Sequence, residues 1–150
     1  MKTSPNGFSI IKQFERLRLT AYKPTKDDVW TLGYGHTKEV KEFDTCTEIQ
    51  ADTWLAEDVE ESELCIDRNV TVELNQNQFD ALVSFVYNEG AKNFGSSTLL
   101  KFLNHKDYEG AAEEFLKWNK QKDKITGEYK VLNGLTIRRN LEKKLFETLV

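Results

Sequence analysis

The 150-residue sequence predicts an α+β fold that is mostly helical, with one small β region early in the chain. Three observations predict this class. Apolar residues recur at helical spacing after residue 75, two capping-box pairs mark helix starts, and the helical period disappears between residues 20 and 37. At this length the chain can bury one core and is too short for two ordinary independent domains. We therefore expect residues 1–150 to form a single domain.

The first predicted element is a helix over residues 8–18, where Ile10, Phe14 and Leu17 follow each other at i, i+4 and i+7. The helical period is then lost. The segment 29–35 combines β-branched and aromatic residues with glycine, a composition typical of short hairpin strands. The β region is therefore expected between residues 20 and 37.

Thr47 and Gln50 form a capping box that predicts an acidic helix running to about Ile66. The only two cysteines, Cys46 and Cys65, lie at its two ends, 19 residues apart. A helix of that length separates their Cα atoms by about 28 Å. A disulfide needs less than about 7 Å, so we expect two free thiols, which fits a reducing compartment.

A second capping box, Asn75 with Gln78, opens the clearest helix of the chain, and Gly90 suits its C-terminal cap. The apolar face of this helix has the spacing i, i+3, i+4, i+7 and i+8: Phe79, Leu82, Val83, Val86 and Tyr87. Shorter helices are expected at about 97–104 and 108–119, a loop or small hairpin at 124–129, and a last helix from about Thr136.

The net charge of −4 is unevenly distributed, because residues 39–90 carry fourteen acidic groups and only two basic ones. These acids can form the solvated face of a helix, or the basic ends of the chain can combine to favour an anionic polymer. No dense Lys/Arg stripe with interleaved aromatic residues occurs, which argues against nucleic acid as a partner. No signal peptide, membrane span, metal site or cofactor motif is recognisable, so synthesis in the cytosol without cofactor or metal is expected.

Glu15 is the first candidate for chemistry, because it falls near the end of a short apolar helix just before the strand region. A carboxyl group at such a junction can lie in a groove, where desolvation and nearby cations act on its pKa in opposite directions. The alternative is a surface glutamate paired with Arg16 or Arg18. The residues alone do not decide between the two.

Two adjacent motifs carry a family resemblance: residues 15–22, ERLRLTAY, and residues 29–37, VWTLGYGHT. They resemble the signature of the phage-lysozyme family, glycoside hydrolase family 24, which reads approximately E-G-x-R-L-x-A-Y, a short gap, and W-T-I-G-Y-G-H-T. The resemblance continues in order through residues 74–85, 88–90, 97–100, 115–118 and 134–139, nearly the whole chain. It implies a lysozyme-like fold of two lobes, with the small β region in one and most helices in the other.

The resemblance implies a muramidase that hydrolyses the β-1,4 bond between N-acetylmuramic acid and N-acetylglucosamine of bacterial peptidoglycan. The family's catalytic acid maps onto Glu15, and the threonine that helps to position water maps onto Thr31. Arg138 matches an arginine at the start of the last helix that faces the glutamate across the substrate cleft. His36 belongs to the motif as a substrate-side residue or, more simply, as a structural partner of an acid in the acidic middle of the chain.

The sequence departs from the family at the second catalytic carboxylate. The family places an aspartate nine residues after the glutamate and six before the threonine. Counting from Glu15 gives Pro24, and counting back from Thr31 gives Thr25, because the interval is one residue longer here. Neither residue is a carboxylate, so the identity of the second acid cannot be transferred by position.

Asp27 and Asp28 follow directly and can supply the second carboxylate through an altered turn, although Asp-Asp is also good turn chemistry. We expect Asp28 to be that carboxylate. The alternative is a water held by Thr25 and Thr31, with Glu15 as the only acid. The stereochemical outcome, inverting or retaining, stays open.

The expected function is therefore that of an endolysin, a monomer that acts on peptidoglycan. It would accumulate in the cytoplasm of an infected bacterium and reach the wall after a separate membrane-permeabilising protein, a holin, opens the membrane. Two alternatives stay open at this point: a chitin-type glycanase using the same acid, and a non-catalytic wall-binding relative.

Overall fold

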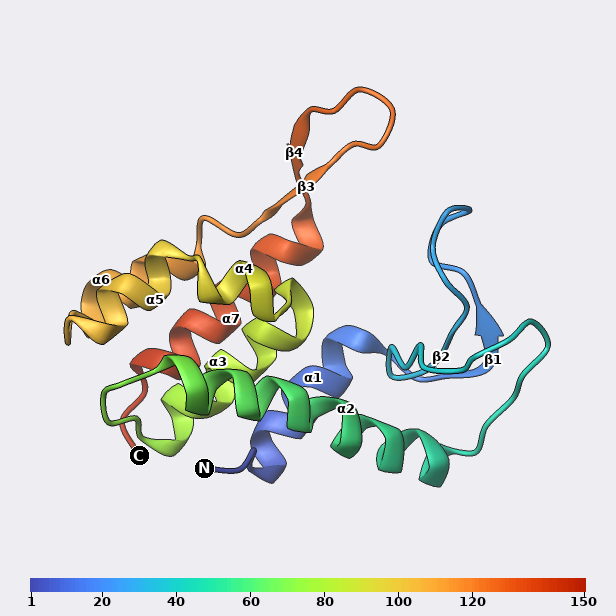
Figure 1. Ribbon diagram of the computed structural model, residues 1–150, viewed down its shortest axis with the longest axis horizontal. Helices are drawn as coiled ribbons and strands as arrows, with labels where there is room; N and C mark the ends of the chain where they lie inside the picture. Colours follow the sequence, from blue (N-terminus) through green and yellow to red (C-terminus); the bar gives the residue numbers. More distant parts are fainter. The chain divides into compact units, whose positions relative to one another are not determined.

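The computed structural model describes all 150 residues, and the chain divides into two compact units. Unit 1 comprises Met1–Gly7 and Ser62–Val150, and unit 2 comprises Phe8–Glu61. The mostly helical α+β class is confirmed: seven helices accompany two small antiparallel sheets (Figure 1). No helix is both long and apolar enough to cross a membrane.

Helix α1 spans Pro5–Glu15, so the predicted bounds of 8–18 were wrong at both ends. The start is earlier because Ser4 acts as an N-cap, its Oγ accepting a hydrogen bond from the backbone N–H of Gly7 at 3.2 Å. Pro5 then occupies the first helical position, where its missing N–H costs nothing. The end is earlier because Arg16 adopts a left-handed backbone, with φ of 52°.

The β region of unit 2 consists of β1, Arg18–Tyr22, paired antiparallel with β2, Thr31–Gly33. Arg18 pairs with Gly33 and Tyr22 with Thr31, so the longer strand is irregular between these points. The prediction of a β region between 20 and 37 is confirmed, although its first strand begins two residues earlier.

Helix α2, Glu48–Asn69, begins at the predicted capping box. The Thr47 backbone N–H donates to Gln50 Oε1 at 2.9 Å, and the Gln50 N–H donates to Thr47 Oγ1 at 3.1 Å. Both cysteines are buried and unpaired, which confirms the expected free thiols. In unit 2, α1, β2 and α2 contribute the buried apolar residues Ile11, Leu32, Ala51, Leu55 and Val59.

The larger part of unit 1 is built from helices α3, Gln76–Glu89; α4, Ala91–Gly95; α5, Thr98–Asn104; α6, Tyr108–Phe115; and α7, Asn133–Glu147. Helix α3 packs against α7, and α5 packs against α6. Phe85 lies at the centre of this core, with its ring edge-on to those of Phe94, Phe115 and Trp118. The Asn75–Gln78 capping box at the start of α3 is confirmed.

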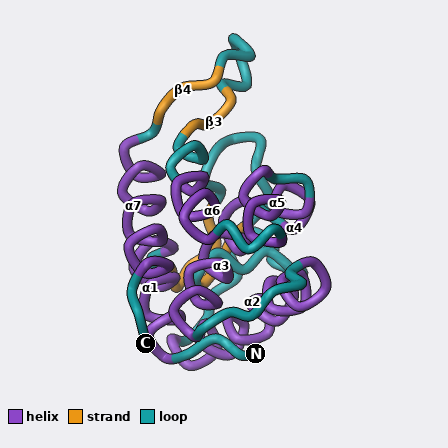
Figure 2. The backbone as a smooth tube through the Cα atoms, turned by 90° about the vertical axis from the view of Figure 1, so that its left-hand side faces the viewer, coloured by secondary structure: helices purple, strands orange, loops and turns teal.

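The structure of unit 1 differs from the prediction in three places. Helix α4 was not predicted; it follows Gly90, whose φ of 93° breaks the chain direction after α3. Helix α6 ends at Phe115 because the next three backbone N–H groups bond three residues back and tighten the turn. Helix α7 begins at Asn133. The segment before it is a hairpin of β3, Lys120–Lys122, and β4, Tyr129–Val131, which extends beyond the N-terminal end of α7 (Figure 2).

Candidate active site

Glu15 is the last residue of α1 and is half-buried. The helix stops there because the left-handed Arg16 turns the chain, while the Arg16 N–H still donates to Lys12 O at 3.1 Å. This stop fixes the position of Glu15 just ahead of β1. Arg16 occupies the position where the resembling signature has glycine, the residue that adopts a left-handed backbone most readily.

Thr31 opens β2 opposite Tyr22 and is buried, with 5% of its surface exposed. Its hydroxyl donates a hydrogen bond to the carbonyl of Val29 at 3.1 Å. A hydroxyl has one proton to donate and two lone pairs to accept with. With the proton directed at Val29, the oxygen of Thr31 is oriented as an acceptor.

Asp28 lies in a turn that precedes β2. Its backbone N–H donates to Thr25 O at 3.1 Å, and the Thr25 hydroxyl donates to Asp28 Oδ2 at 2.9 Å. Asp28 is half-buried, whereas Asp27 is exposed. The two residues that the sequence offered as alternatives, Thr25 and Asp28, are therefore joined in one turn.

Two glycines shape the chain after Thr31. Gly33 and Gly35 have φ of 67° and 87°, and a Cβ on Gly33 would lie 3.1 Å from the Cβ of Ala51. The backbones of Leu32 and His36 exchange two hydrogen bonds of 2.9 Å around this turn. These glycines thus serve a tight turn that places His36 against α2.

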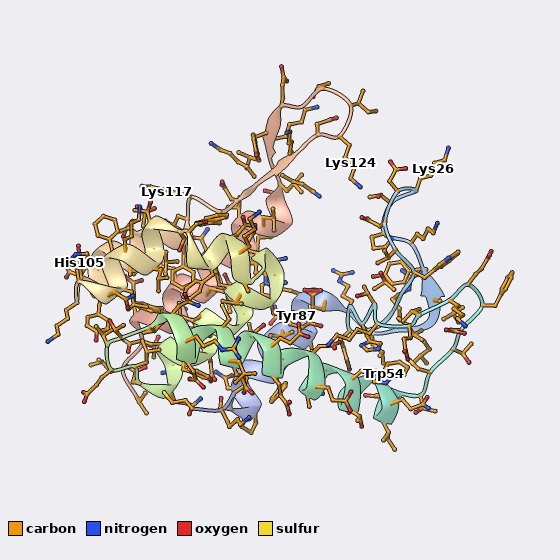
Figure 3. All side chains as sticks on the ribbon, viewed as in Figure 1. Lys26, Trp54, Tyr87, His105, Lys117 and Lys124 are labelled. Atoms are coloured by element: carbon orange, nitrogen blue, oxygen red, sulfur yellow. The ribbon has the colours of Figure 1, made fainter.

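His36 is fixed by two residues of α2. Its Nδ1 lies 2.7 Å from Asp58 Oδ2, and its ring stacks on that of Trp54 with centroids 4.5 Å apart. Figure 3 marks the place of Trp54 on α2. Because a carboxylate only accepts, Nδ1 is the donor in this pair. The expected acidic partner is confirmed as Asp58. With only 8% of its surface exposed, His36 is built into unit 2, although it lines a cavity of about 290 Å³.

Arg138 belongs to unit 1 and lies on α7, where it is 3% exposed. Its guanidinium donates to the carbonyl of Ser84 at 3.1 Å and to Glu142 at 3.2 Å. The neighbouring Arg139 contacts Glu89 and Glu142, each at 2.7 Å. Burial raises the pKa of Glu89, and the positive charge of Arg139 opposes that rise.

The sequence interpretation missed Glu89 and Glu142 as members of this buried charge network. The available signal was the spacing of Glu142, three residues after Arg139 and four after Arg138, which places the three charges on neighbouring positions of one helix. Charged residues on helices are normally assigned to the solvent face, and here that assumption fails.

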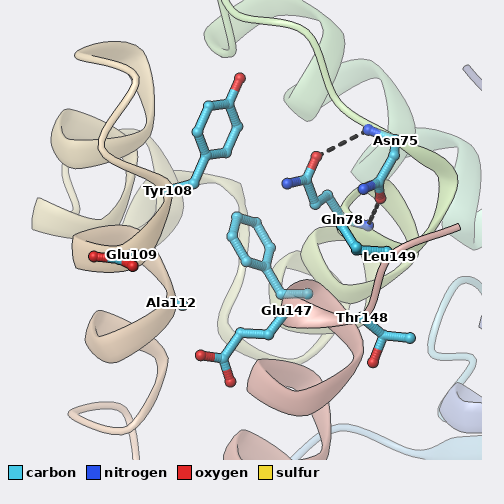
Figure 4. Close-up of a pocket in the computed structure, with 9 residues that line it drawn as sticks. Asn75, Gln78, Tyr108, Glu109, Ala112, Glu147, Thr148 and Leu149 are labelled. Atoms are coloured by element: carbon cyan, nitrogen blue, oxygen red, sulfur yellow. Dashed lines mark hydrogen bonds between the residues drawn. The ribbon is translucent and has the colours of Figure 1, made fainter.

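The structure also contains a cavity of about 290 Å³ near the C-terminus of unit 1 (Figure 4). Its amide side chains, Asn75 and Gln78, are engaged in the capping box of α3, and the Tyr108 hydroxyl donates to Glu73 O at 2.8 Å. No group of three or more His, Cys, Asp or Glu residues is placed to hold a metal ion. The catalytic candidates therefore remain Glu15, Asp28 and Thr31 in unit 2.

Comparison with known proteins gives consistent matches over the chain. The endolysin of Acyrthosiphon pisum secondary endosymbiont phage 1 is 45% identical over 148 residues, covering 99% of both chains. The endolysin of Bacillus phage B103 is 44% identical and is longer, so that the match covers 99% of this chain and 55% of that protein. The muramidase domain of SpmX from Asticcacaulis excentricus superposes with a TM-score of 0.92 at 38% identity, covering 99% of each chain.

The model of the family described as phage lysozyme matches residues 12–142, a range that includes Glu15, Asp28, Thr31, His36 and Arg138. A match over most of the chain, together with a relative of 45% identity along nearly its whole length, decides the family. The chain belongs to the phage lysozyme family.

Proposed function

We propose that this protein is an endolysin that hydrolyses the β-1,4 bond between N-acetylmuramic acid and N-acetylglucosamine in bacterial peptidoglycan. The observation that carries the proposal is Glu15, held at the end of α1 by the left-handed Arg16, in a chain of the phage lysozyme family. The relatives' names, endolysin and muramidase, support the same substrate. They give no support to the chitin-type or the binding-only alternative.

Glu15 acts in its protonated form. It gives its proton to the glycosidic oxygen as the bond from that oxygen to the anomeric carbon breaks. A water molecule attacks the electron-poor anomeric carbon and must lose a proton in turn. This second proton needs an acceptor, and we assign Asp28 to that role. The support for Asp28 over Asp27 is that Asp28 is half-buried and oriented by the Thr25 hydroxyl, whereas Asp27 is exposed.

Thr31 holds the attacking water. Its own proton is directed to the Val29 carbonyl, so its oxygen accepts a hydrogen bond from the water. A water that donates to Thr31 keeps a lone pair for attack. In the alternative without Asp28, Thr25 and Thr31 would hold the water between them, and the same geometry of Thr31 would apply.

We assign His36 and Arg138 to supporting roles. His36 braces the turn after Thr31 through Asp58 and Trp54, and Arg138 fixes α7 to α3 through Ser84. Direct contact of either side chain with substrate stays a prediction. Action as a monomer and release to the wall by a separate holin also stay predictions.

The proposal is tested by Glu15→Gln, which keeps the shape of the side chain and removes its acidic proton. We expect folding like that of the wild type and a loss of at least ~10²-fold in the lysis of outer-membrane-permeabilised cells followed by turbidity. Glu60→Gln, an exposed glutamate of α2, is the matched control and should lyse normally. More than a tenth of wild-type activity in Glu15→Gln would refute the assignment.

A further inference from the structure

The β3–β4 hairpin is the most exposed ordered element of unit 1. Every residue of both strands is exposed, and Figure 2 shows the hairpin extending beyond the packed helices of this unit. Its turn is well defined, because Asp123 Oδ1 accepts hydrogen bonds from the backbones of Ile125 and Thr126 at 2.8 and 3.1 Å. An ordered element that buries none of its residues contributes little to a core, so its side chains are available for another role.

The strand register divides the hairpin into two faces. Lys120 is opposite Val131 and Lys122 is opposite Tyr129, and residues directly opposite each other project from the same side. Gln121 and Lys130 project from the other side. We call Lys120, Lys122, Tyr129 and Val131 the hairpin face.

The hairpin face borders a cavity of about 440 Å³ within unit 1. Lys120 and Tyr129 line this cavity together with residues of the helical part, among them Glu89, Glu114, Lys117 and Trp118. Figure 3 marks Lys117 on that helical part. Tyr129 is 68% exposed and Val131 is 59% exposed, so apolar surface accompanies the lysines.

The two acidic side chains that line this cavity are both paired with a cation. Glu89 is matched by Arg139 at 2.7 Å, and Glu114 is matched by Lys117 at 2.9 Å. Lys120 and Lys122 form no ion pair, whereas Lys130 on the opposite face lies 3.4 Å from Asp123. The unmatched charge on the hairpin face is therefore positive. A cationic surface with aromatic and aliphatic side chains fits an anionic ligand with apolar parts.

We propose that the hairpin face binds the carboxylate-bearing peptide stems of peptidoglycan, with Lys120 and Lys122 contacting the carboxylates. This inference rests on the proposed function, because it takes peptidoglycan as the substrate. The choice of stem follows from the polymer's chemistry. N-acetylglucosamine is neutral, and the lactyl carboxyl group of N-acetylmuramic acid forms the amide bond to the peptide, so it carries no charge. The free carboxylates of the strand thus lie on the stems, with apolar alanine side chains beside them for Tyr129 and Val131.

The test compares two soluble glycan strands that both carry stems, one with free stem carboxylates and one with those carboxylates converted to amides. The variant is Lys120→Gln with Lys122→Gln. On the strands with free carboxylates we expect KM to rise about fivefold with kcat within about twofold, as for the loss of two exposed ion pairs. On the amidated strands the variant and the wild type should have the same KM, because this substrate has no stem carboxylates for the lysines to contact.

Two single variants provide the matched control. Lys122→Gln and Lys130→Gln remove one charge each from the same hairpin, on opposite faces. Only Lys122→Gln should raise KM on the free-carboxylate strands. Equal effects of the two, or a double variant whose KM equals that of the wild type on free-carboxylate strands, would overturn the proposal. Failure of the wild type to cleave either strand would instead overturn the proposed function.

Discussion

At the scale of single residues, the hydrogen bond of Asp28 fits two different roles, one catalytic and one structural. Its bond from the Thr25 hydroxyl can serve catalysis, by orienting the carboxylate, or can serve only the turn that precedes β2. The two roles differ in whether the side chain must be a charged carboxylate. A turn needs an acceptor oxygen, which asparagine also provides, whereas removal of a proton from water needs the basicity of a carboxylate.

We therefore predict that Asp28→Asn lowers the rate of peptidoglycan hydrolysis by at least ~10²-fold while the melting temperature changes little. Asp27→Asn is the matched control at the adjacent exposed position and should retain activity. Both rates are measured on purified sacculi beside Thr31→Ala. Normal lysis by both asparagine variants would exclude a second carboxylate and leave the water to Thr25 and Thr31.

Glu15 and Thr31 could be named from sequence because each lies in a motif whose residue order matches the family signature. Asp28 lies in the longer interval between the two motifs, so the order of residues offered it only as one of two neighbouring acids. The partner of His36 could be predicted only as some acid of residues 39–90, since pairing with Asp58 across 22 positions depends on how the turn at Gly33 meets α2. Helical spacing places Glu142 beside Arg138 and Arg139, but no sequence signal shows that Glu142 and Glu89 are buried. Their burial depends on the packing of α3 against α7, which no local pattern records.

At the scale of elements, helix ends were predictable where a side chain of standard type forms the cap. Both capping boxes, at Thr47 and at Asn75, are confirmed. The ends of α6 and α1 were not predictable from periodicity, because apolar spacing continues beyond the last helical residue in both. What stops α1 is the backbone of Arg16, and no side-chain rule predicts a left-handed arginine.

The left-handed Arg16 leads to a prediction for α1. A residue with a Cβ in this conformation costs about 1 kcal/mol or more relative to glycine. Arg16→Gly should therefore raise the free energy of unfolding by about 1 kcal/mol, less the entropy that glycine adds to the unfolded chain. Activity should be retained, because Glu15 still ends the helix.

Denaturant unfolding measures this change, with Arg16→Ala as the control. Alanine removes the same guanidinium but keeps a Cβ, so it should give no gain in stability. If Arg16→Ala stabilises the protein as much as Arg16→Gly, the arginine side chain and not the backbone is the source of the strain.

At the scale of the whole molecule, the chain combines two compact units with two helices that belong to both. Helix α1 has residues 5–7 in unit 1 and 8–15 in unit 2, and α2 has residues 48–61 in unit 2 and 62–69 in unit 1. Helix formation is cooperative along the chain, so melting one part of a helix weakens the adjacent turns. This sharing of helices supports the expectation, drawn from chain length, that residues 1–150 form one domain.

We accordingly predict a single unfolding transition in scanning calorimetry, with the calorimetric enthalpy equal to the van't Hoff enthalpy. Leu55→Ala and Leu103→Ala are matched probes, because both leucines are fully buried, one on α2 in unit 2 and the other on α5 in unit 1. Each should cost about 2–5 kcal/mol. In a single domain of this size each substitution lowers the one transition by roughly 5–15 °C. Two resolved transitions, one moved only by Leu55→Ala and the other only by Leu103→Ala, would show that the units unfold independently, because a transition confined to one unit is insensitive to a cavity in the other.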